Sequence, residues 1–240
     1  MSATKLILYD ITSVLSDKAW SRNVWRVRYL LNIKGIQYQT RWLSHPEIEP
    51  ELKRIGASPT SHWMLKAETY TLPVMYDASK KTVLSDSNTI AAYLEETFPE
   101  TRSLRVAQSI EFVQSFGARL NESLFPLLVA PTAENLLPET RAAWRTKREK
   151  AYGTTLEAMA EPDTKRAELL KVVDDELSYR DVAIAATLIN ARRVGGADSD
   201  IWRALMEAHE GRWRELMSHF AQWEAVDVGI DSSCTGSTSS

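Results

Sequence analysis

The sequence predicts a chain of two parts, an α/β part in residues 1–99 and an all-helical part in residues 105–228. Short strand-like runs occur only in the first part, and the apolar residues of the second part recur only at helical spacing. The strand-like runs are Leu6–Tyr9, Tyr38–Leu43, Val74–Tyr76 and Thr82–Leu84. A content of 44% hydrophobic and 25% charged residues is typical of a globular protein, and 240 residues suffice for one domain or two closely packed ones.

In chain order, the first part alternates strands and helices. Apolar residues at helical spacing after the first strand predict a helix that Gly35 ends as a C′ glycine. A short helix over Ile48–Ile55 and a loop over Ala57–Tyr70 follow the second strand. A polar turn at Asp77–Lys80 joins the last two strands as a β-hairpin. A helix over Asn88–Phe98 closes this part and is stopped by a proline.

The second part shows helical periodicity in successive stretches, without an internal repeat. They are Ala107–Leu120, Glu139–Ala160, Lys165–Asp174, Ser178–Arg193, Ile201–His209 and Arg212–Trp223. The final segment, Gly229–Ser240, is almost entirely Gly, Ser, Thr and Asp. Such a segment buries too little apolar surface to offset its ordering entropy, so a disordered tail is predicted.

The composition argues against several classes of function. A net charge of −3 encodes no general attraction to nucleic acid or to an anionic membrane. No apolar run approaches the roughly 20 residues of a membrane-spanning helix, and no signal peptide is visible, so a cytosolic protein is expected. The single cysteine, Cys234, rules out an internal disulfide, and the four histidines lack metal-ligand spacing, so no metal site is expected.

Two predicted helix starts carry polar residues of chemical interest. Ser21 stands where the first loop meets the first helix, where unpaired N–H groups and the helix dipole favour an anion. Its hydroxyl can donate to a thiolate there, or it can be a purely structural N-cap. Asn23 is either a second donor or an ordinary polar residue of the first turn. Asp86 and Ser87 precede an apolar helix and by themselves fit an ordinary helix start.

Three separated motifs carry a resemblance to a known family. They are residues 20–29 (WSRNVWRVRY), 71–74 (TLPV) and 84–94 (LSDSNTIAAYL). The order β-α-β-α-β-β-α, with a proline entering the third strand, is that of a thioredoxin-like domain. With a helical part appended, the chain resembles glutathione transferases, in particular the fungal etherase-related class (fungus-specific class A), which is similar to bacterial lignin β-etherases. The resemblance runs over Lys5–Pro99 and Ser178–Val226.

The resemblance implies a glutathione site in the first part. Ser21 falls on the family's catalytic position and would hydrogen-bond the glutathione sulfur. Pro73 would follow a cis bond that turns the backbone of Leu72 toward the cysteinyl unit, although the residues alone fit an ordinary proline at the start of an edge strand equally well. Asp86 would bind the α-ammonium group and Ser87 the α-carboxylate of the γ-glutamyl unit.

It also implies a second ligand and an activity. A hydrophobic aromatic electrophile would bind between the two parts, where Trp20 and Trp25 either wall the pocket or pack between domains. Thiolate attack would cleave an aryl ether, conjugate another electrophile or reduce a peroxide. The alternative is a non-catalytic carrier of glutathione and aromatic small molecules. A homodimer is implied by the resemblance alone.

The chain departs from the family pattern at three places. Arg22 stands where the family usually has proline, and Asp86 stands where it usually has glutamate. The segment Glu161–Leu177 looks shorter than its family counterpart. Nothing ranks the candidate cations for the glycyl carboxylate, which are Lys53, His62 and Lys66.

Two further patterns have structural interpretations. Ser178 with Asp181 three residues later forms a capping box at the start of a helix. The basic residues of the run Arg141–Lys150 lie at helical spacing with acidic residues nearby, which favours a solvated helix face over a nucleic-acid patch.

Overall fold

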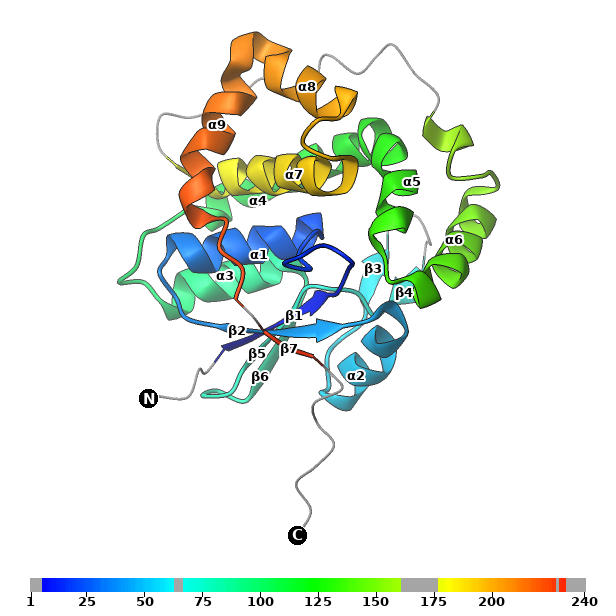
Figure 1. The fold of residues 1–240 in the computed structure, drawn as a ribbon. Helices are drawn as coiled ribbons and strands as arrows, with labels where there is room; N and C mark the ends of the chain where they lie inside the picture. Colours follow the sequence, from blue (N-terminus) through cyan, green and yellow to red (C-terminus); the bar gives the residue numbers. More distant parts are fainter. Residues whose placement is uncertain (1–5, 63–66, 161–176, 228, 232–240) are drawn as a thin grey trace.

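The computed structural model describes residues 6–62, 67–160, 177–227 and 229–231 (Figure 1). The strands are β1 (Leu6–Ile11), β2 (Gln39–Leu43), β3 (Thr60–His62), β4 (Ala67–Thr69), β5 (Val74–Asp77), β6 (Thr82–Ser85) and β7 (Ile230–Asp231). The helices of the first part are α1 (Arg22–Ile33), α2 (Ile48–Arg54) and α3 (Ser87–Thr97). Those of the second part are α4 (Val106–Ser123), α5 (Phe125–Asn135), α6 (Pro138–Tyr152), α7 (Tyr179–Gly195), α8 (Asp200–Glu207) and α9 (Arg212–Phe220).

A mixed sheet of order β6-β5-β1-β2-β7 organises the first part. β1 pairs in parallel with β2 and antiparallel with β5, which continues into the β6 hairpin. Because side chains alternate along a strand, β1 contributes side chains to two apolar clusters, one on each face of the sheet. Leu6 and Leu8 pack with α1 and α3, whereas Tyr9 and Ile11 pack with α2. The helices α1 and α3 therefore cover one face of the sheet and α2 the other (Figure 1).

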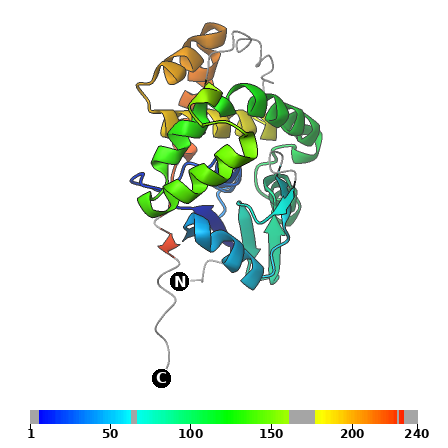
Figure 2. The ribbon, with the colours of Figure 1, turned by 90° about the vertical axis from the view of Figure 1, so that its right-hand side faces the viewer.

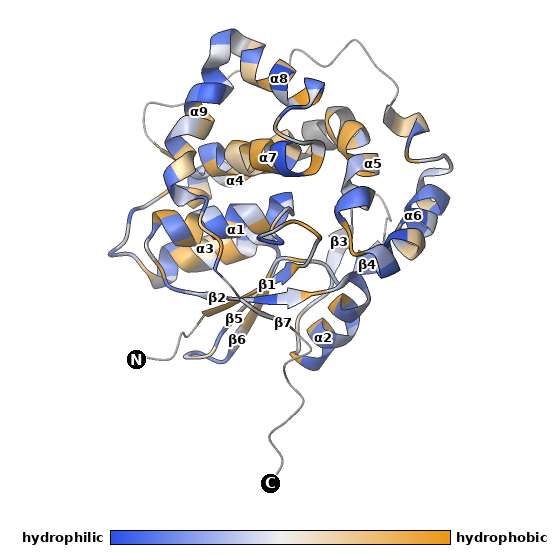
Figure 3. Cartoon of the chain, in the orientation of Figure 1, coloured by the Kyte–Doolittle hydropathy of each residue, from blue (hydrophilic) through white to orange (hydrophobic). Residues whose placement is uncertain are grey.

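α7 is the central helix of the second part, and it packs on α1, α4, α5, α8 and α9. Every residue from Val182 to Ile189 is buried, which explains why this stretch of α7 has no polar face (Figure 3). Because α1 lies between the sheet and α7 (Figure 1), the two parts share one apolar core, and Figure 2 shows the helical part stacked on the α/β part. None of the described helices combines the length and the apolar character that crossing a membrane requires.

This architecture confirms the predicted fold class but corrects several elements. The predicted helix Glu139–Ala160 ends at Tyr152, because Gly153 forms a left-handed C-cap. The predicted loop Ala57–Tyr70 contains the short hairpin β3–β4, whose three-residue strands leave little periodic signal. The helix α5 was not predicted, because Pro126 and Pro131 signal breaks. Pro126 lies in the first turn, where proline is tolerated, and Pro131 is accommodated inside the helix. The predicted helix Lys165–Asp174 lies outside the described residues.

The prediction of a disordered tail from Gly229 onward is wrong for residues 229–231. Ile230 and Asp231 form β7, which pairs in parallel with β2. Strand pairing uses main-chain groups and needs no apolar side chain, so composition did not predict it. Gly229 has φ +71°, and a Cβ there would lie 2.2 Å from Nε1 of Trp42, so this close approach requires glycine. The residues after Asp231 lie outside the described part of the chain.

Candidate functional site

Ser21 is the N-cap of α1, with an extended backbone (φ −64°, ψ 119°). Its carbonyl accepts the first helical hydrogen bond, from Trp25 N at 2.8 Å, but its hydroxyl makes no capping bond. The side chain is half-buried, and the first turn of α1 contains no acidic residue. The structural N-cap interpretation therefore fits the backbone of Ser21 but leaves its hydroxyl and the positive helix end available to an anion.

The Leu72–Pro73 peptide bond is cis, as the resemblance implies. Pairing between β1 and β5 begins at Val74, where Val74 faces Tyr9. Leu72 is half-buried and lies just before this ladder. Its main chain is thus outside the paired part of the strand, where an extended peptide can be added.

Asp86 caps α3 as the structural interpretation predicts. Its Oδ1 accepts from the N–H groups of Asn88 (2.8 Å) and Thr89 (3.1 Å). The residue is exposed and has φ +77° and ψ 135°, a positive-φ backbone that few residues other than glycine adopt. Ser87, the next residue, is only 4% exposed. The pair therefore places a negative charge on the surface beside the positive N-terminus of α3.

The sequence did not indicate that Tyr179 and Arg26 lie beneath this helix start. The Tyr179 hydroxyl donates to Oδ1 of Asn88 (3.0 Å) and lies 3.4 Å from the carbonyl oxygen of Ser87. Burial raises the pKa of Tyr179 to about 12, although Arg26 opposes this rise, so the hydroxyl remains a neutral donor. Arg26 is 6% exposed, and its buried Nε has no partner among the described residues. The signal available in the sequence was Arg26 itself, a charged residue between the apolar residues Val24, Trp25 and Val27 of the first predicted helix.

Arg22 adds a second guanidinium beside Ser21. Burial, and then the positive charge of Arg26, lower the pKa of Arg22 to about 9. Arg22 still carries its charge at neutral pH. An anion bound near these two cations would relieve their repulsion, so the start of α1 is electrostatically suited to a negatively charged group.

The assignment of Trp25 to a ligand pocket is wrong. Trp25 is 1% exposed and lies in the core between α1 and α7, with the Arg193 guanidinium 4.9 Å from its ring centroid. Its position on the inner face of α1 places it between the two parts, as the alternative interpretation predicted. Trp20 is half-buried, and its Nε1 has no partner among the described residues, so its role as a pocket wall remains a prediction.

The remaining candidates are only partly described. Asn23 is exposed in the first turn of α1, and its role as a second donor remains a prediction. The Lys53 ammonium is paired with Glu49 at 2.7 Å on the surface of α2. Lys66 lies outside the described residues, as does the side chain of His62.

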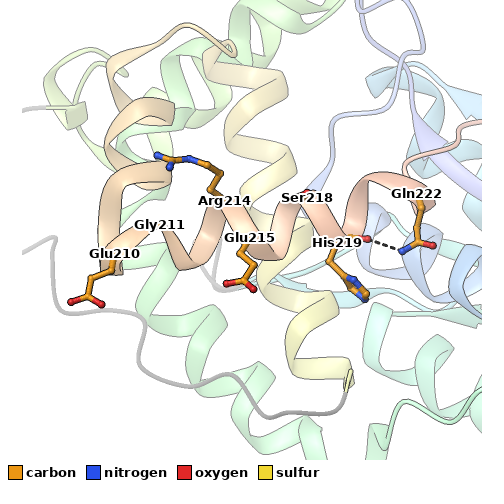
Figure 4. Close-up of a pocket in the computed structure, with 7 residues that line it drawn as sticks. All are labelled: Glu210, Gly211, Arg214, Glu215, Ser218, His219 and Gln222. Carbon is orange, nitrogen blue, oxygen red and sulfur yellow. Dashed lines mark hydrogen bonds between the residues drawn. The ribbon is translucent and has the colours of Figure 1, made fainter.

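Two of the surface hollows that the described residues form lie away from these groups. One, of about 670 Å³, runs along α9 and has a polar lining that includes Glu215 and His219 (Figure 4). The other, of about 630 Å³, lies between β2 and α2. Neither is lined by Ser21 or Ser87, and neither is the predicted aromatic pocket. No three metal-ligating side chains come together among the described residues.

Comparisons with protein families match both parts of the chain. The glutathione S-transferase N-terminal domain matches residues 20–97. The glutathione S-transferase C-terminal domain matches residues 107–178 and 168–223. Among curated proteins, the glutathione S-transferase-like protein ustS of Aspergillus flavus is 26% identical, over 91% of this chain and 90% of its own.

Solved structures agree with these matches. The glutathione transferase GSTFuA3 from Phanerochaete chrysosporium is 32% identical, with a TM-score of 0.78 over 92% of this chain and 98% of its own. A glutathione S-transferase of Ceriporiopsis subvermispora, crystallised in complex with glutathione, is also 32% identical, with a TM-score of 0.80 over 92% and 98% of the two chains. Each of these two alignments covers 92% of this chain and so spans both parts of the fold. The chain therefore belongs to the glutathione S-transferase family.

Proposed function

We propose that this glutathione transferase activates the thiol of glutathione with Ser21 for attack on hydrophobic aromatic electrophiles. The observation that carries the proposal is the Ser21 hydroxyl, which lies at the positive end of α1 without a capping bond. A hydroxyl donor and a helix N-terminus both stabilise a thiolate over a thiol. They would lower the thiol pKa from about 8.5 toward neutrality.

Three further groups fit the rest of the tripeptide. The backbone of Leu72, before the β5 ladder, supplies an N–H and a C=O for the cysteinyl unit. The N-terminus of α3 at Ser87 suits the γ-glutamyl carboxylate, and the exposed Asp86 carboxylate suits the α-ammonium group. Support also comes from the Ceriporiopsis subvermispora relative, which was crystallised with glutathione.

The reaction needs no group beyond these. The thiol gives its proton to solvent, and the thiolate sulfur then forms a bond to the electrophilic carbon. In an aryl ether the carbon–oxygen bond breaks, and the leaving oxygen takes the bonding electron pair and a proton. Conjugation of other electrophiles and peroxide reduction begin with the same thiolate.

A carrier without turnover would bind aromatic ligands and glutathione but yield no adduct. A homodimer and a cytosolic location also remain predictions.

Isothermal calorimetry with glutathione tests the site through two variants of Asp86. Asp86→Asn keeps an oxygen that can cap α3 but removes the charge, whereas Asp86→Ala removes both. We expect Asp86→Asn to weaken glutathione about ten-fold, the equivalent of one charged hydrogen bond, with little loss of thermal stability. Asp86→Ala should bind as weakly and should also be less stable, by about 1 kcal/mol. No binding to the wild type, or unchanged affinity in both variants, would contradict the proposed site.

A further inference from the structure

We infer that Asn190 and Arg193 of α7 are positioning residues, which hold the loop before Ser21 so that its hydroxyl points at the glutathione sulfur. This inference rests on the proposed function of Ser21. It assigns to the all-helical part a role in activating the thiol, in addition to binding the second substrate.

Asn190 acts on the peptide bond that enters Ser21. Its Nδ2 donates to the carbonyl oxygen of Trp20 at 2.8 Å, across 170 positions of sequence. The Trp20 carbonyl and the Ser21 N–H belong to one planar peptide unit. Fixing this carbonyl therefore fixes the plane from which the Ser21 side chain extends.

Arg193, about one turn of α7 further on, holds the same loop four residues before Ser21. Its Nη1 donates to both carboxylate oxygens of Asp17, at 2.6 Å to Oδ1. Its guanidinium also lies 4.9 Å from the ring centroid of Trp25 in α1. Asp17 precedes Ser21 and Trp25 follows it, so Arg193 ties together the two segments that flank Ser21.

The loop depends on such outside support. The hydrogen bonds within it are local, such as those from the Ser13 hydroxyl to the Lys18 carbonyl (2.9 Å) and from Ala19 N to the Asp17 carbonyl (2.7 Å), and they close only short turns. Val14 N donates to the carbonyl oxygen of Asn135 at the end of α5 (3.0 Å), which attaches the start of the loop to the second part as well. Because Ser21 makes no capping bond, only its backbone and rotamer set the direction of its hydroxyl.

The expected effect of losing Asn190 is confined to the glutathione sulfur. Glutathione binding draws on Leu72, Asp86 and Ser87, which lie on other elements than this loop. Loss of Asn190 should therefore weaken the hydrogen bond to the thiolate while leaving affinity for the peptide nearly unchanged. A positioning effect of this kind is visible in the thiol pKa, which a purely structural role would not move.

The test compares Asn190→Ala with Asn32→Ala. Asn32 of α1 is a matched control, because its Nδ2 also donates to main-chain carbonyls of a distant segment, Trp223 (2.7 Å) and Ala225 (3.0 Å). The thiolate absorbance of bound glutathione is titrated with pH, and its Kd is measured by calorimetry. We expect Asn190→Ala to raise the thiol pKa by about 0.5–1 unit, with Kd changed less than two-fold. Asn32→Ala should leave the titration unchanged.

A double-mutant cycle shows whether Asn190 acts through Ser21. In the Ser21→Ala background, Asn190→Ala should cause no further rise in the thiol pKa. An unchanged titration in Asn190→Ala, or an equal additional shift in the Ser21→Ala background, would overturn the inference.

Arg193→Lys provides a second variant if Asn190→Ala folds poorly. It keeps the charge but loses the planar guanidinium that contacts Asp17 and at the same time lies over the Trp25 ring, and should raise the thiol pKa in the same direction. An unchanged titration in a folded Arg193→Lys protein would count against the role of Arg193. If Ser21→Ala itself leaves the titration unchanged, the proposed function fails and the inference with it. If only the α7 variants leave it unchanged, the inference alone fails.

Discussion

Ser21 and Ser178 occupy the same position, the N-cap of a long helix that crosses the shared core, yet their hydroxyl groups have different partners. The Ser178 N–H and hydroxyl both donate to Oδ2 of Asp181 at 2.8 Å, and Ser178 is 2% exposed. The Ser21 hydroxyl makes no such bond and is half-buried. The hydroxyl of Ser178 is thus committed to folding, whereas that of Ser21 is available to a ligand.

The third residue after each cap explains this difference. After Ser178 it is Asp181, which closes the capping box, and after Ser21 it is Val24, which is fully buried and cannot. The residue next to Ser21, Arg22, brings positive charge to a helix end that an acidic residue would stabilise. The start of α1 is therefore weakly capped as a helix and well suited to an external anion.

The largest effect is expected from Ser21→Ala. Because this hydroxyl makes no bond within the helix, the free energy of unfolding should change by less than about 0.5 kcal/mol. The kcat/KM for an aromatic electrophile should fall about 10- to 100-fold at neutral pH, since less of the bound thiol is ionised. Steady-state kinetics with denaturant unfolding measures both quantities. A large loss of stability with unchanged kinetics would show that Ser21 is a structural cap.

The opposite result is expected from Ser178→Ala. Removing this capping hydroxyl should lower the free energy of unfolding by about 1–2 kcal/mol, because Asp181 loses a buried donor. Urea unfolding measures the loss, and Ser178→Thr, which keeps a hydroxyl, should recover much of it. Kinetics with glutathione should be unchanged in the folded fraction. A fall in kcat/KM as large as that expected for Ser21→Ala would show that the two serines do not differ in function.

Ser44→Ala should have the smallest effect and sharpens the same distinction. Ser44 caps the short 3-10 turn before α2, and both its N–H (2.7 Å) and its hydroxyl (2.6 Å) donate to Oε2 of Glu47. Since Ser44 is half-exposed, water can replace the lost bond, and the cost should be below about 1 kcal/mol. Thermal unfolding measures it. A change in glutathione affinity would show that a cap elsewhere in the first part, here the one before α2, affects the glutathione site.

Local patterns predicted the elements that place the site. Strand periodicity, the hairpin turn and the helix starts at Ser21 and Asp86 are all readable within a few residues of sequence. The support around the site was not readable, because it depends on tertiary packing. Arg26 is buried through its contact with Tyr179, and Asn190 reaches Trp20 from 170 residues away.

Sequence patterns also left two features undecided or unpredicted, because tertiary packing determines them. The sequence left open whether Trp20 and Trp25 wall a pocket or pack between domains, and the structure decides this for Trp25, which lies on the face of α1 that α7 covers. The helix α5 was not among the predicted stretches, and the structure shows that it tolerates Pro126 in its opening turn and contains Pro131.

The pH titration of thiolate absorbance for bound glutathione tests the role of Ser21 most directly. The wild type should ionise the bound thiol well below the free-thiol pKa of about 8.5, so that much of it is thiolate at neutral pH. In Ser21→Ala the titration should move upward by about one to two pH units, while glutathione still binds. A wild-type thiol that titrates like free glutathione, or a titration that Ser21→Ala leaves in place, would contradict thiol activation by Ser21.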